Sequence, residues 1–258
     1  MPDEPMEPHA LLEDWRREEQ EPFEGWDFSH LNGRCIEDQP PWDYMQRAAA
    51  LMDQADSVLD MDTGGGEKLL SLRDHWPQRV VVTEGYPPNI ALAQQNLGPL
   101  GVLIVPMESS DSTIMPFANG VFDLVLNRHG AFNAAECFRI LKSGGVFLTK
   151  QVHGLWAQDL LAVFGATPPW PDSTPANNVE RLKAAGLEIV EMQDWQGKLR
   201  FTDVGAIVYY LKAIPWLVPD FTVERYQRQL FGLQARLDAG ESLTFEARTY
   251  LIEARKPA

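Results

Sequence analysis

Residues 58–70 read VLDMDTGGGEKLL, an apolar run that stops at two acids and three consecutive glycines before a helical pattern resumes. Glycine has no Cβ atom, so such a turn lets the backbone approach a ligand closely and adopt positive φ. In a doubly wound sheet, the turn from the first strand into the following helix is a common place for a ligand. The stretch therefore predicts a ligand cradle, and the alternative is a tight turn with a purely structural role. The residues of this predicted cradle are Asp60, Asp62, Gly64, Gly65 and Gly66.

Short apolar runs rich in Val, Leu and Ile alternate with helix-like segments on both sides of this turn. The apolar runs are 57–61, 79–84, 101–106, 122–127, 145–150, 187–192 and 249–255. Such alternation is typical of a parallel sheet that is covered by helices on both faces. We therefore predict an α/β fold with a doubly wound, mostly parallel seven-stranded sheet, preceded by a helix at 43–55.

Two segments fall outside this alternation. Residues 1–42 begin with an acidic stretch and are predicted to form an N-terminal helical arm. A long span with helix-like patterns at 203–216 and 223–238 separates the last two strands and exceeds the length of an ordinary loop. We predict one domain over 43–258 with a helical insertion at about 195–242. The arm and the insertion either cover a ligand site or add packing.

The charge balance limits the expected partners. With 22 Lys and Arg against 37 Asp and Glu, the formal net charge is −15. Phosphate backbones are bound chiefly by clustered Lys and Arg, so this balance disfavours a protein that grips long nucleic acid. It favours a small-molecule substrate.

Cysteine content and hydropathy indicate the compartment. Cys35 and Cys137 are the two cysteines, without a CxxC or a Cys/His cluster, so neither a disulfide framework nor a metal site is predicted. The acidic N-terminus has no apolar signal region, and the apolar stretch 204–218 is interrupted by Lys212 and Pro215. We expect a cytoplasmic protein without a membrane-spanning segment.

Acids at the ends of the first three strands distinguish among cofactors. The dinucleotide fingerprint GxGxxG fails because Leu69 stands at its last glycine, and Glu67 would repel a phosphate at the helix start. Glu84 ends the second strand, where a carboxylate can accept both hydroxyls of a ribose. Asp111 follows the third strand, where an acid can accept a hydrogen bond from an adenine amino group. The pattern favours an adenosyl cofactor that carries positive charge and no phosphate.

At these residues the chain resembles the class I S-adenosylmethionine-dependent methyltransferases. The resemblance covers about residues 43–192, and its motifs are VLDMDTGGGE, VVVTEGY, SSDSTIMPFANGVFDLVLNRH and LKSGGVFLTKQV. It implies a Rossmann-like methyltransferase fold with S-adenosylmethionine as the methyl donor. A looser similarity to an uncharacterised bacterial branch of the family rests on GWDFS at 25–29 and DVGAIVYYLKAIPW at 203–216.

The resemblance also implies a role for each motif. Asp60 and glycines 64–66 would border the methionine moiety of the cofactor, and Asn127 would face that moiety or the substrate. The remaining implied contacts are the ribose with Glu84 and Gly85, and the adenine with Asp111 and Ser112. One residue departs from the pattern, because the family usually has a glycine where this chain has Asp62. That carboxylate either forms a salt bridge with the cofactor ammonium group or crowds the site.

Methyl transfer from a sulfonium is an in-line displacement that depends chiefly on alignment, so no single catalytic residue is required. A base is needed only if the acceptor must lose a proton, and His129, just past the fourth strand, is the best-placed candidate. Asn127 is a weaker catalytic candidate, and Arg128 is a candidate to bind an acidic group of the acceptor. Trp26 and Tyr210 would line an acceptor pocket. Packing is the alternative role for each of these residues.

Three functions remain open at this level. The first is a methyltransferase for a small molecule, and the second is a methyltransferase for ribosomal RNA, which the net charge disfavours. The third is a protein that binds S-adenosylmethionine without catalysis and acts as a sensor or partner. A DNA amino methyltransferase is not expected, because the fourth strand ends in NRHG rather than in an Asn/Asp-Pro-Pro-aromatic run. The acceptor and the oligomeric state are not predicted.

Overall fold

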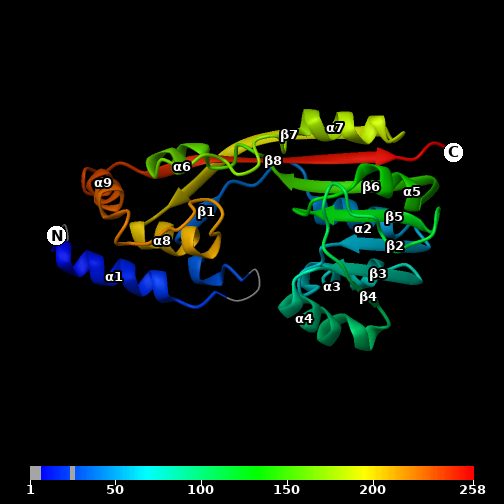
Figure 1. The fold of residues 1–258 in the computed structure, drawn as a ribbon, viewed down its shortest axis with the longest axis horizontal. Coiled ribbons are helices and arrows are strands. Elements are labelled where there is room, and N and C mark those ends of the chain that lie inside the picture. Colours follow the sequence, from blue (N-terminus) through cyan, green and yellow to red (C-terminus); the bar gives the residue numbers. More distant parts are fainter. Residues whose placement is uncertain (1–6, 24–26) are drawn as a thin grey trace. The chain divides into compact units, whose positions relative to one another are not determined.

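The computed structural model of the protein describes residues 7–23 and 27–258 (Figure 1). The chain divides into two compact units. Unit 1 comprises Met1–Pro40, Gly154–Pro171 and Gln196–Arg248, and unit 2 comprises Pro41–His153, Asp172–Trp195 and Thr249–Ala258.

Unit 2 contains the parallel strands of an α/β sheet (Figure 1). The strands are β2 (Ser57–Met61), β3 (Arg79–Glu84), β4 (Leu103–Pro106), β5 (Phe122–Arg128) and β6 (Leu141–Val152). Strand β2 pairs in parallel with both β3 and β5, β3 continues to β4, and β5 continues to β6. The chain therefore reverses its direction of travel across the sheet between β2 and β5. Such a switch point is where ligands bind in doubly wound sheets, beside the carboxyl ends of the strands.

Two long strands complete the sheet. Strand β8 (Leu243–Arg255) pairs antiparallel with β6, and β7 (Glu188–Phe201) lies beyond it, so the order is β7-β8-β6-β5-β2-β3-β4. In unit 1, the short strand β1 (Cys35–Glu37) pairs antiparallel with residues 199–201 of β7. Within the described residues the sheet thus has eight strands and is mostly parallel.

Helices cover both faces of the sheet in unit 2. They are α2 (Tyr44–Met52), α3 (Glu67–Leu70), η2 (Arg73–His75), α4 (Pro87–Leu97), η3 (Gly98–Leu100), α5 (Ala134–Ile140) and α7 (Pro175–Ala184). Side chains of a strand alternate between faces, so Val58 packs in one core cluster and Leu59 in another. The first cluster includes residues of α2, α3 and α4, and the second includes residues of α5 and α7. Both faces being buried explains why the strands read as continuous apolar runs.

An ion pair with one buried partner fixes the first of these helices. Asp43 caps α2 by accepting hydrogen bonds from the backbone amides of Met45 and Gln46. From the next turn, Arg47 donates two hydrogen bonds, of 2.6 and 2.7 Å, to the carboxylate of Glu253 on β8. The Glu253 side chain has no exposed surface. Helix α2 is therefore tied to the sheet by a charge that is removed from water.

Unit 1 is mainly helical. Its helices are α1 (Pro8–Gln20), η1 (Ser29–Leu31), α6 (Gln158–Val163), α8 (Val204–Ala213) and α9 (Gln227–Asp238). Asp203 caps α8 by accepting from the amide of Ala206. Arg34 binds the same carboxylate at 2.7 and 3.0 Å and also pairs with Glu18 of α1 at 2.8 Å. This network holds α1 against α8.

Several sequence expectations need correction. The sheet has eight strands rather than seven, because β1 lies within the segment that was predicted to be a helical arm. Strand β7 continues to Phe201 and β8 begins at Leu243, so the insertion between them is shorter than predicted, and β6 begins at Leu141. The missed portions alternate polar and apolar residues, a pattern weaker than the continuous apolar runs. Among the helices of the described residues, none has the length and hydrophobicity needed to cross a membrane.

Candidate functional site

The glycine turn leaves β2 at the switch point and runs directly into α3. Gly64 and Gly66 have φ values of 65° and 85°, which glycine adopts without strain. A Cβ atom at Gly66 would lie 2.5 Å from Leu97 Cδ1, and one at Gly65 would lie 2.5 Å from Leu92 Cδ2. A side chain at either of these two glycines would press on a leucine side chain of α4, whatever ligand the turn receives.

Asp62 occupies an unusual position in this turn. Its φ is 54°, in the left-handed region that Asp tolerates better than most side chains. Its backbone amide donates to Thr83 Oγ1 at 3.3 Å. A Cβ atom at Gly130 would collide with Asp62 Oδ2 and would lie 3.0 Å from Asn127 Nδ2. The Asp62 carboxylate therefore reaches from the end of β2 to the loop that follows β5.

Glu84 organises the turn through its own carboxylate. Its side chain is 6% exposed, and Oε2 accepts from the Gly64 amide at 2.7 Å. Oε1 accepts from the amides of Gly85 and Tyr86 at 2.9 and 2.8 Å. A carboxylate offers about four lone-pair sites, so about one of them is left for a ligand hydroxyl. Gly85 is needed because a Cβ there would lie 2.8 Å from the Cα of Glu108.

Two aspartates of the turn have raised pKa values. Burial raises the pKa of Asp60 to about 7, against a hydrogen bond from Thr63 Oγ1 at 2.7 Å, and the charges of Asp62 and Glu84 add to the effect. Burial raises the pKa of Asp62 to about 6, and Glu84 adds to this while the Ser109 hydroxyl opposes it. The turn thus concentrates negative charge that water does not fully solvate.

A small cavity of about 40 Å³ adjoins these acids. Its polar lining is Tyr44, Asp60, Asp62, Thr63, Lys68 and Arg128. The fold thereby brings together Asp60, Asp62 and Arg128, which were singled out in the sequence, and adds Tyr44 and Lys68, which were not. The first residue of α2 and a lysine in the first turn of α3 carry no motif, so only their place in the fold identifies them.

A polar network closes the carboxyl ends of β5 and β6. The fully buried Asn127 accepts at Oδ1 from Thr149 Oγ1 at 2.9 Å and from Gln151 Nε2 at 2.6 Å. Gln151 Nε2 also donates to the carbonyl of Gly130 at 2.9 Å. Asn127 Nδ2 is buried and has no hydrogen-bond partner. Sequence reasoning missed Thr149 and Gln151, although their alternation at the end of an apolar strand was a visible signal.

His129 follows this network and has a positive φ of 64°. His129 is exposed at the surface, yet partial desolvation of its ring and the charges of Arg128 and Lys150 lower the pKa of His129 from its usual range. Its imidazole is therefore neutral near neutral pH and able to accept a proton, although a lowered pKa makes it a weak base.

The remaining candidate residues lie elsewhere. Asp111 and Ser112 are exposed on the loop after β4, where the Ser112 amide donates to Ser110 Oγ at 3.2 Å. Tyr210 is buried in unit 1, and its hydroxyl accepts from Trp156 Nε1 at 2.9 Å. Trp26 lies outside the described residues. Tyr210 is thus a buried residue of unit 1, and its place in an acceptor pocket stays a prediction.

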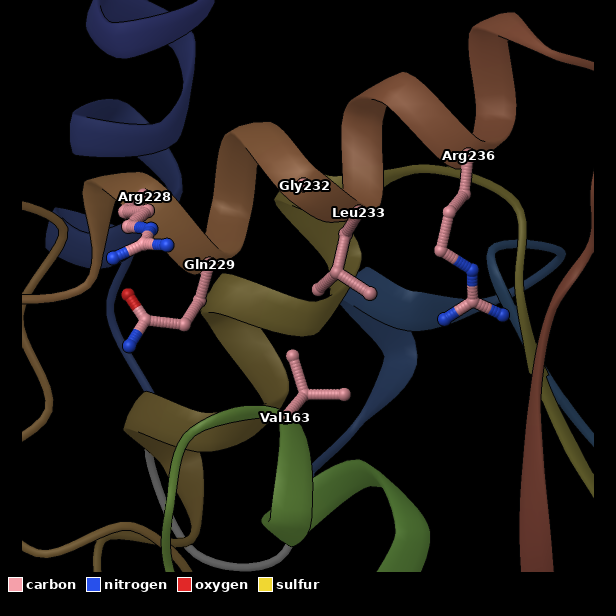
Figure 2. A pocket seen from close by; sticks show the side chains of 6 residues that line it. All are labelled: Val163, Arg228, Gln229, Gly232, Leu233 and Arg236. Carbon is pink, nitrogen blue, oxygen red and sulfur yellow. The ribbon is translucent and has the colours of Figure 1, made fainter.

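Unit 1 has a pocket of its own, of about 380 Å³, along one side of α9 (Figure 2). The lining residues are Val163, Arg228, Gln229, Gly232, Leu233 and Arg236. In Figure 2 the side chains of Leu233 and Val163 point toward each other between the two arginines. Arg236 also pairs with Glu241 at 3.1 Å. None of the site residues predicted from the sequence lines this pocket.

The residues of the switch point fit S-adenosylmethionine. Asp60, Asp62 and Glu84 surround the turn with carboxylates, which suits a ligand with a sulfonium and an ammonium group and would repel a pyrophosphate. The unpaired donor on Asn127 provides a contact that the protein itself does not satisfy. The closely packed glycine turn completes the cradle.

Comparison with known proteins agrees with this assignment. Residues 59–149 match the family model described as a methyltransferase domain. This match to part of the chain supports the resemblance to the class I S-adenosylmethionine-dependent methyltransferases, a family whose cofactor is S-adenosylmethionine.

Two curated relatives are demethylmenaquinone methyltransferases. The protein from Thermus thermophilus is 32% identical over 96 residues, covering 34% of this chain and 43% of the relative. The protein from Deinococcus radiodurans is 30% identical over 112 residues, covering 40% and 46%. The chain thus matches less than half the length of these relatives.

Solved structures share the fold. A protein from Bacillus halodurans C-125 with a provisional methyltransferase assignment has a TM-score of 0.58 at 20% identity, covering 83% of this chain and 97% of that one. The YcgJ protein from Bacillus subtilis has a TM-score of 0.58 at 17% identity, covering 83% and 98%. At these identities the likeness concerns the Rossmann-like methyltransferase fold alone.

Proposed function

We propose that this protein transfers a methyl group from S-adenosylmethionine to a small-molecule acceptor. The observation that carries the proposal is the anionic glycine turn at the switch point, where the Glu84 carboxylate holds the Gly64 amide at 2.7 Å. This turn lies within the segment that matches the methyltransferase domain. Bound S-adenosylmethionine would supply an activated methyl group on a positively charged sulfur.

The residues of unit 2 would bind and orient this cofactor. Asp60, Asp62 and glycines 64–66 would border its methionine moiety, with the Asn127 amide facing the same end. Glu84 beside Gly85 would accept one ribose hydroxyl through its remaining lone pair. Asp111 and Ser112 would contact the adenine from the loop after β4. These roles follow the family pattern, and the anionic character of the turn supports them.

The acceptor is proposed to be a small molecule. Both curated relatives act on demethylmenaquinone, as their names state, and the formal net charge of −15 disfavours a nucleic-acid acceptor. The N-terminal residues 1–42 and the insertion at about 195–242 are proposed to cover the acceptor. Arg128 is proposed to bind an acidic group of the acceptor, and neutral His129 to receive a proton where the acceptor must lose one.

A second candidate function is binding of S-adenosylmethionine without catalysis. The observation that favours it is Asp62, which stands where the family usually has glycine and reaches toward Gly130. A carboxylate in that place would hold the cofactor without aligning it for transfer. This candidate and the first share the binding step and differ in turnover.

The test combines binding with transfer. Calorimetric titration with S-adenosylmethionine is expected to give one site per chain, and the exposed variant Arg228→Ala, in the pocket of unit 1, should bind equally well. Purified protein and labelled methyl donor are then incubated with metabolite, RNA and protein fractions. Label in the metabolite fraction alone supports the first candidate. Label in RNA or protein contradicts it, and binding without transfer to any fraction favours the second.

A further inference from the structure

The carboxylates of Asp60, Asp62 and Glu84 lie together at the turn formed by residues 60–64. Asp60 accepts from Thr63 Oγ1 at 2.7 Å, and Glu84 accepts from the Gly64 amide at 2.7 Å. Asp62 lies between them in the turn, and its charge and that of Glu84 both act on Asp60. Because opposite charges attract more strongly where water is partly excluded, a cation placed beside these carboxylates would be favoured.

Asp62 is the member of this group whose carboxylate reaches beyond the turn. Asp60 and Glu84 accept hydrogen bonds that build the turn, whereas the Asp62 carboxylate extends to Gly130, where a Cβ atom would collide with it. Its φ of 54° would suit glycine better than any other residue. The chain therefore carries an aspartate at a position whose backbone conformation favours glycine.

An independent observation indicates that a ligand completes this place. Asn127 Nδ2 lies within 3.0 Å of the same point beside Gly130, is buried, and has no hydrogen-bond partner. An unpaired buried donor costs roughly 1–3 kcal/mol, which native proteins rarely tolerate away from ligand sites. The Asp62 carboxylate and the unsatisfied amide donor of Asn127 thus both lie beside Gly130.

We propose that Asp62 makes this site selective for the positively charged sulfonium donor over the neutral thioether product that remains after methyl transfer. The inference rests on the proposed function. In the transfer, the bond between sulfur and the methyl carbon breaks, sulfur keeps the electron pair, and a new bond joins that carbon to the acceptor. The ligand thereby loses one positive charge with little change of shape. The product keeps the ammonium group, so its attraction to the carboxylates weakens rather than vanishes, and it is held less tightly than the donor.

Other ionisable side chains around Asp62 also influence how strongly the site attracts a positively charged ligand. They are Tyr44, Asp60, Lys68, Glu84, Arg128 and His129. Arg128 opposes the acids, since its charge lowers the pKa of Asp60, and neutral His129 adds no charge. Burial raises the pKa of Asp60 to about 7 and that of Asp62 to about 6, so selectivity should weaken on acidification as both carboxylates become protonated.

Calorimetry with S-adenosylmethionine and S-adenosylhomocysteine tests this inference. At about pH 8 the wild type should bind the sulfonium about tenfold more tightly, and this ratio should fall toward unity at about pH 5. Asp62→Asn, which keeps the shape, and Asp62→Gly, which suits the backbone, should both lower the ratio at the higher pH. An analogue with an amine in place of the sulfonium should follow the charged donor.

The control and the outcomes separate the inference from the function. Asp74→Asn removes the same charge from an exposed side chain of η2 and should leave the ratio unchanged. If both ligands bind equally to the wild type, or if both Asp62 variants keep the wild-type ratio, the inference is overturned while the proposed function stands. If neither ligand binds to the wild type, both are overturned.

Discussion

Glu84 on β3 accepts a hydrogen bond at 2.7 Å from the backbone amide of Gly64, in the turn that follows β2. The same carboxylate accepts the amides of Gly85 and Tyr86. One side chain thus sets the conformation of two neighbouring loops at the switch point. Its structural role and its proposed contact with ribose cannot be separated by simple truncation.

Replacement of this carboxylate should affect stability and binding together. In Glu84→Gln, an amide group replaces one oxygen, so at least one backbone amide loses its acceptor in a buried place. We expect the free energy of unfolding to fall by roughly 1–3 kcal/mol and the affinity for S-adenosylmethionine to drop. Urea unfolding and calorimetry measure the two effects. Glu188→Gln, exposed on β7, is the matched control, and equal unfolding of both variants would contradict the expected role.

The contact of Asp62 with the Gly130 loop makes a double-mutant prediction. Gly130→Ala places a methyl group against Asp62 Oδ2 and should destabilise the protein by about 1–3 kcal/mol. Asp62→Gly removes the obstacle, so the double variant should recover most of this loss. The coupling free energy from chemical unfolding of the four proteins is the measurement. Strict additivity of the two changes would show that these residues do not touch.

The pair of half-exposed Arg47 and buried Glu253 makes a second stability prediction. Arg47→Met leaves the buried carboxylate without its partner and should cost roughly 1–3 kcal/mol. The double variant Arg47→Met, Glu253→Met removes both charges and should lose much less. Urea unfolding compares them, with Arg200→Met at the exposed pair with Asp38 as the control. Equal losses in the single and double variants would be inconsistent with a desolvated charge.

Stability should also depend on the acids of the turn. Burial raises the folded-state pKa of Asp60 to about 7 and of Asp62 to about 6, whereas both titrate near about 4 in an unfolded chain. Between these values the folded state binds more protons, so their contribution to the free energy of unfolding falls as pH rises from about 4 to about 7. His129 acts oppositely, because its folded pKa is lowered and the unfolded chain binds more protons below about pH 6.5.

Asp62→Asn isolates one of these contributions. The variant cannot lose the proton, so relative to the wild type it should gain on the order of 2 kcal/mol between about pH 4 and pH 7. Urea unfolding at several pH values measures the difference, and Asp74→Asn should run parallel to the wild type. If the free energy of unfolding of Asp62→Asn followed that of the wild type at every pH, the Asp62 carboxylate of the wild type would have to be well solvated.

Much of the fold follows from local patterns. The continuous apolar runs at 57–61 and 79–84 coincide with β2 and β3, because strands buried on both faces must be apolar at every position. The ends of β7 and β8 were missed, because strands that alternate in burial resemble polar loops. Strand β1 has three residues and forms only by pairing with β7, so no local signal specifies it.

Some residues of the candidate site are likewise indicated by local sequence patterns, whereas others are revealed only by the fold. Asp60, Asp62 and Glu84 could be found because each ends an apolar strand, and parallel strands bring their carboxyl ends to one edge of the sheet. Thr149 and Gln151 were missed because their role lies in the hydrogen bonds they donate to Asn127 on the preceding strand, β5. Tyr210 stays a candidate for the acceptor pocket, since an aromatic residue in a helix gives the same sequence pattern whether it lines a pocket or a core.

The sequence by itself determined the α/β class, the switch point and the anionic glycine turn, because hydrophobic alternation and strand-end acids are local properties of the chain. Only the tertiary structure decided how those acids are used. Three of the lone pairs of Glu84 go to backbone amides, Asp62 reaches Gly130, and Asn127 keeps an unpaired donor. Each of these depends on the register between strands that are distant in sequence. Hydrogen-bond partners and the burial of charge are set by that register, and no local pattern encodes them.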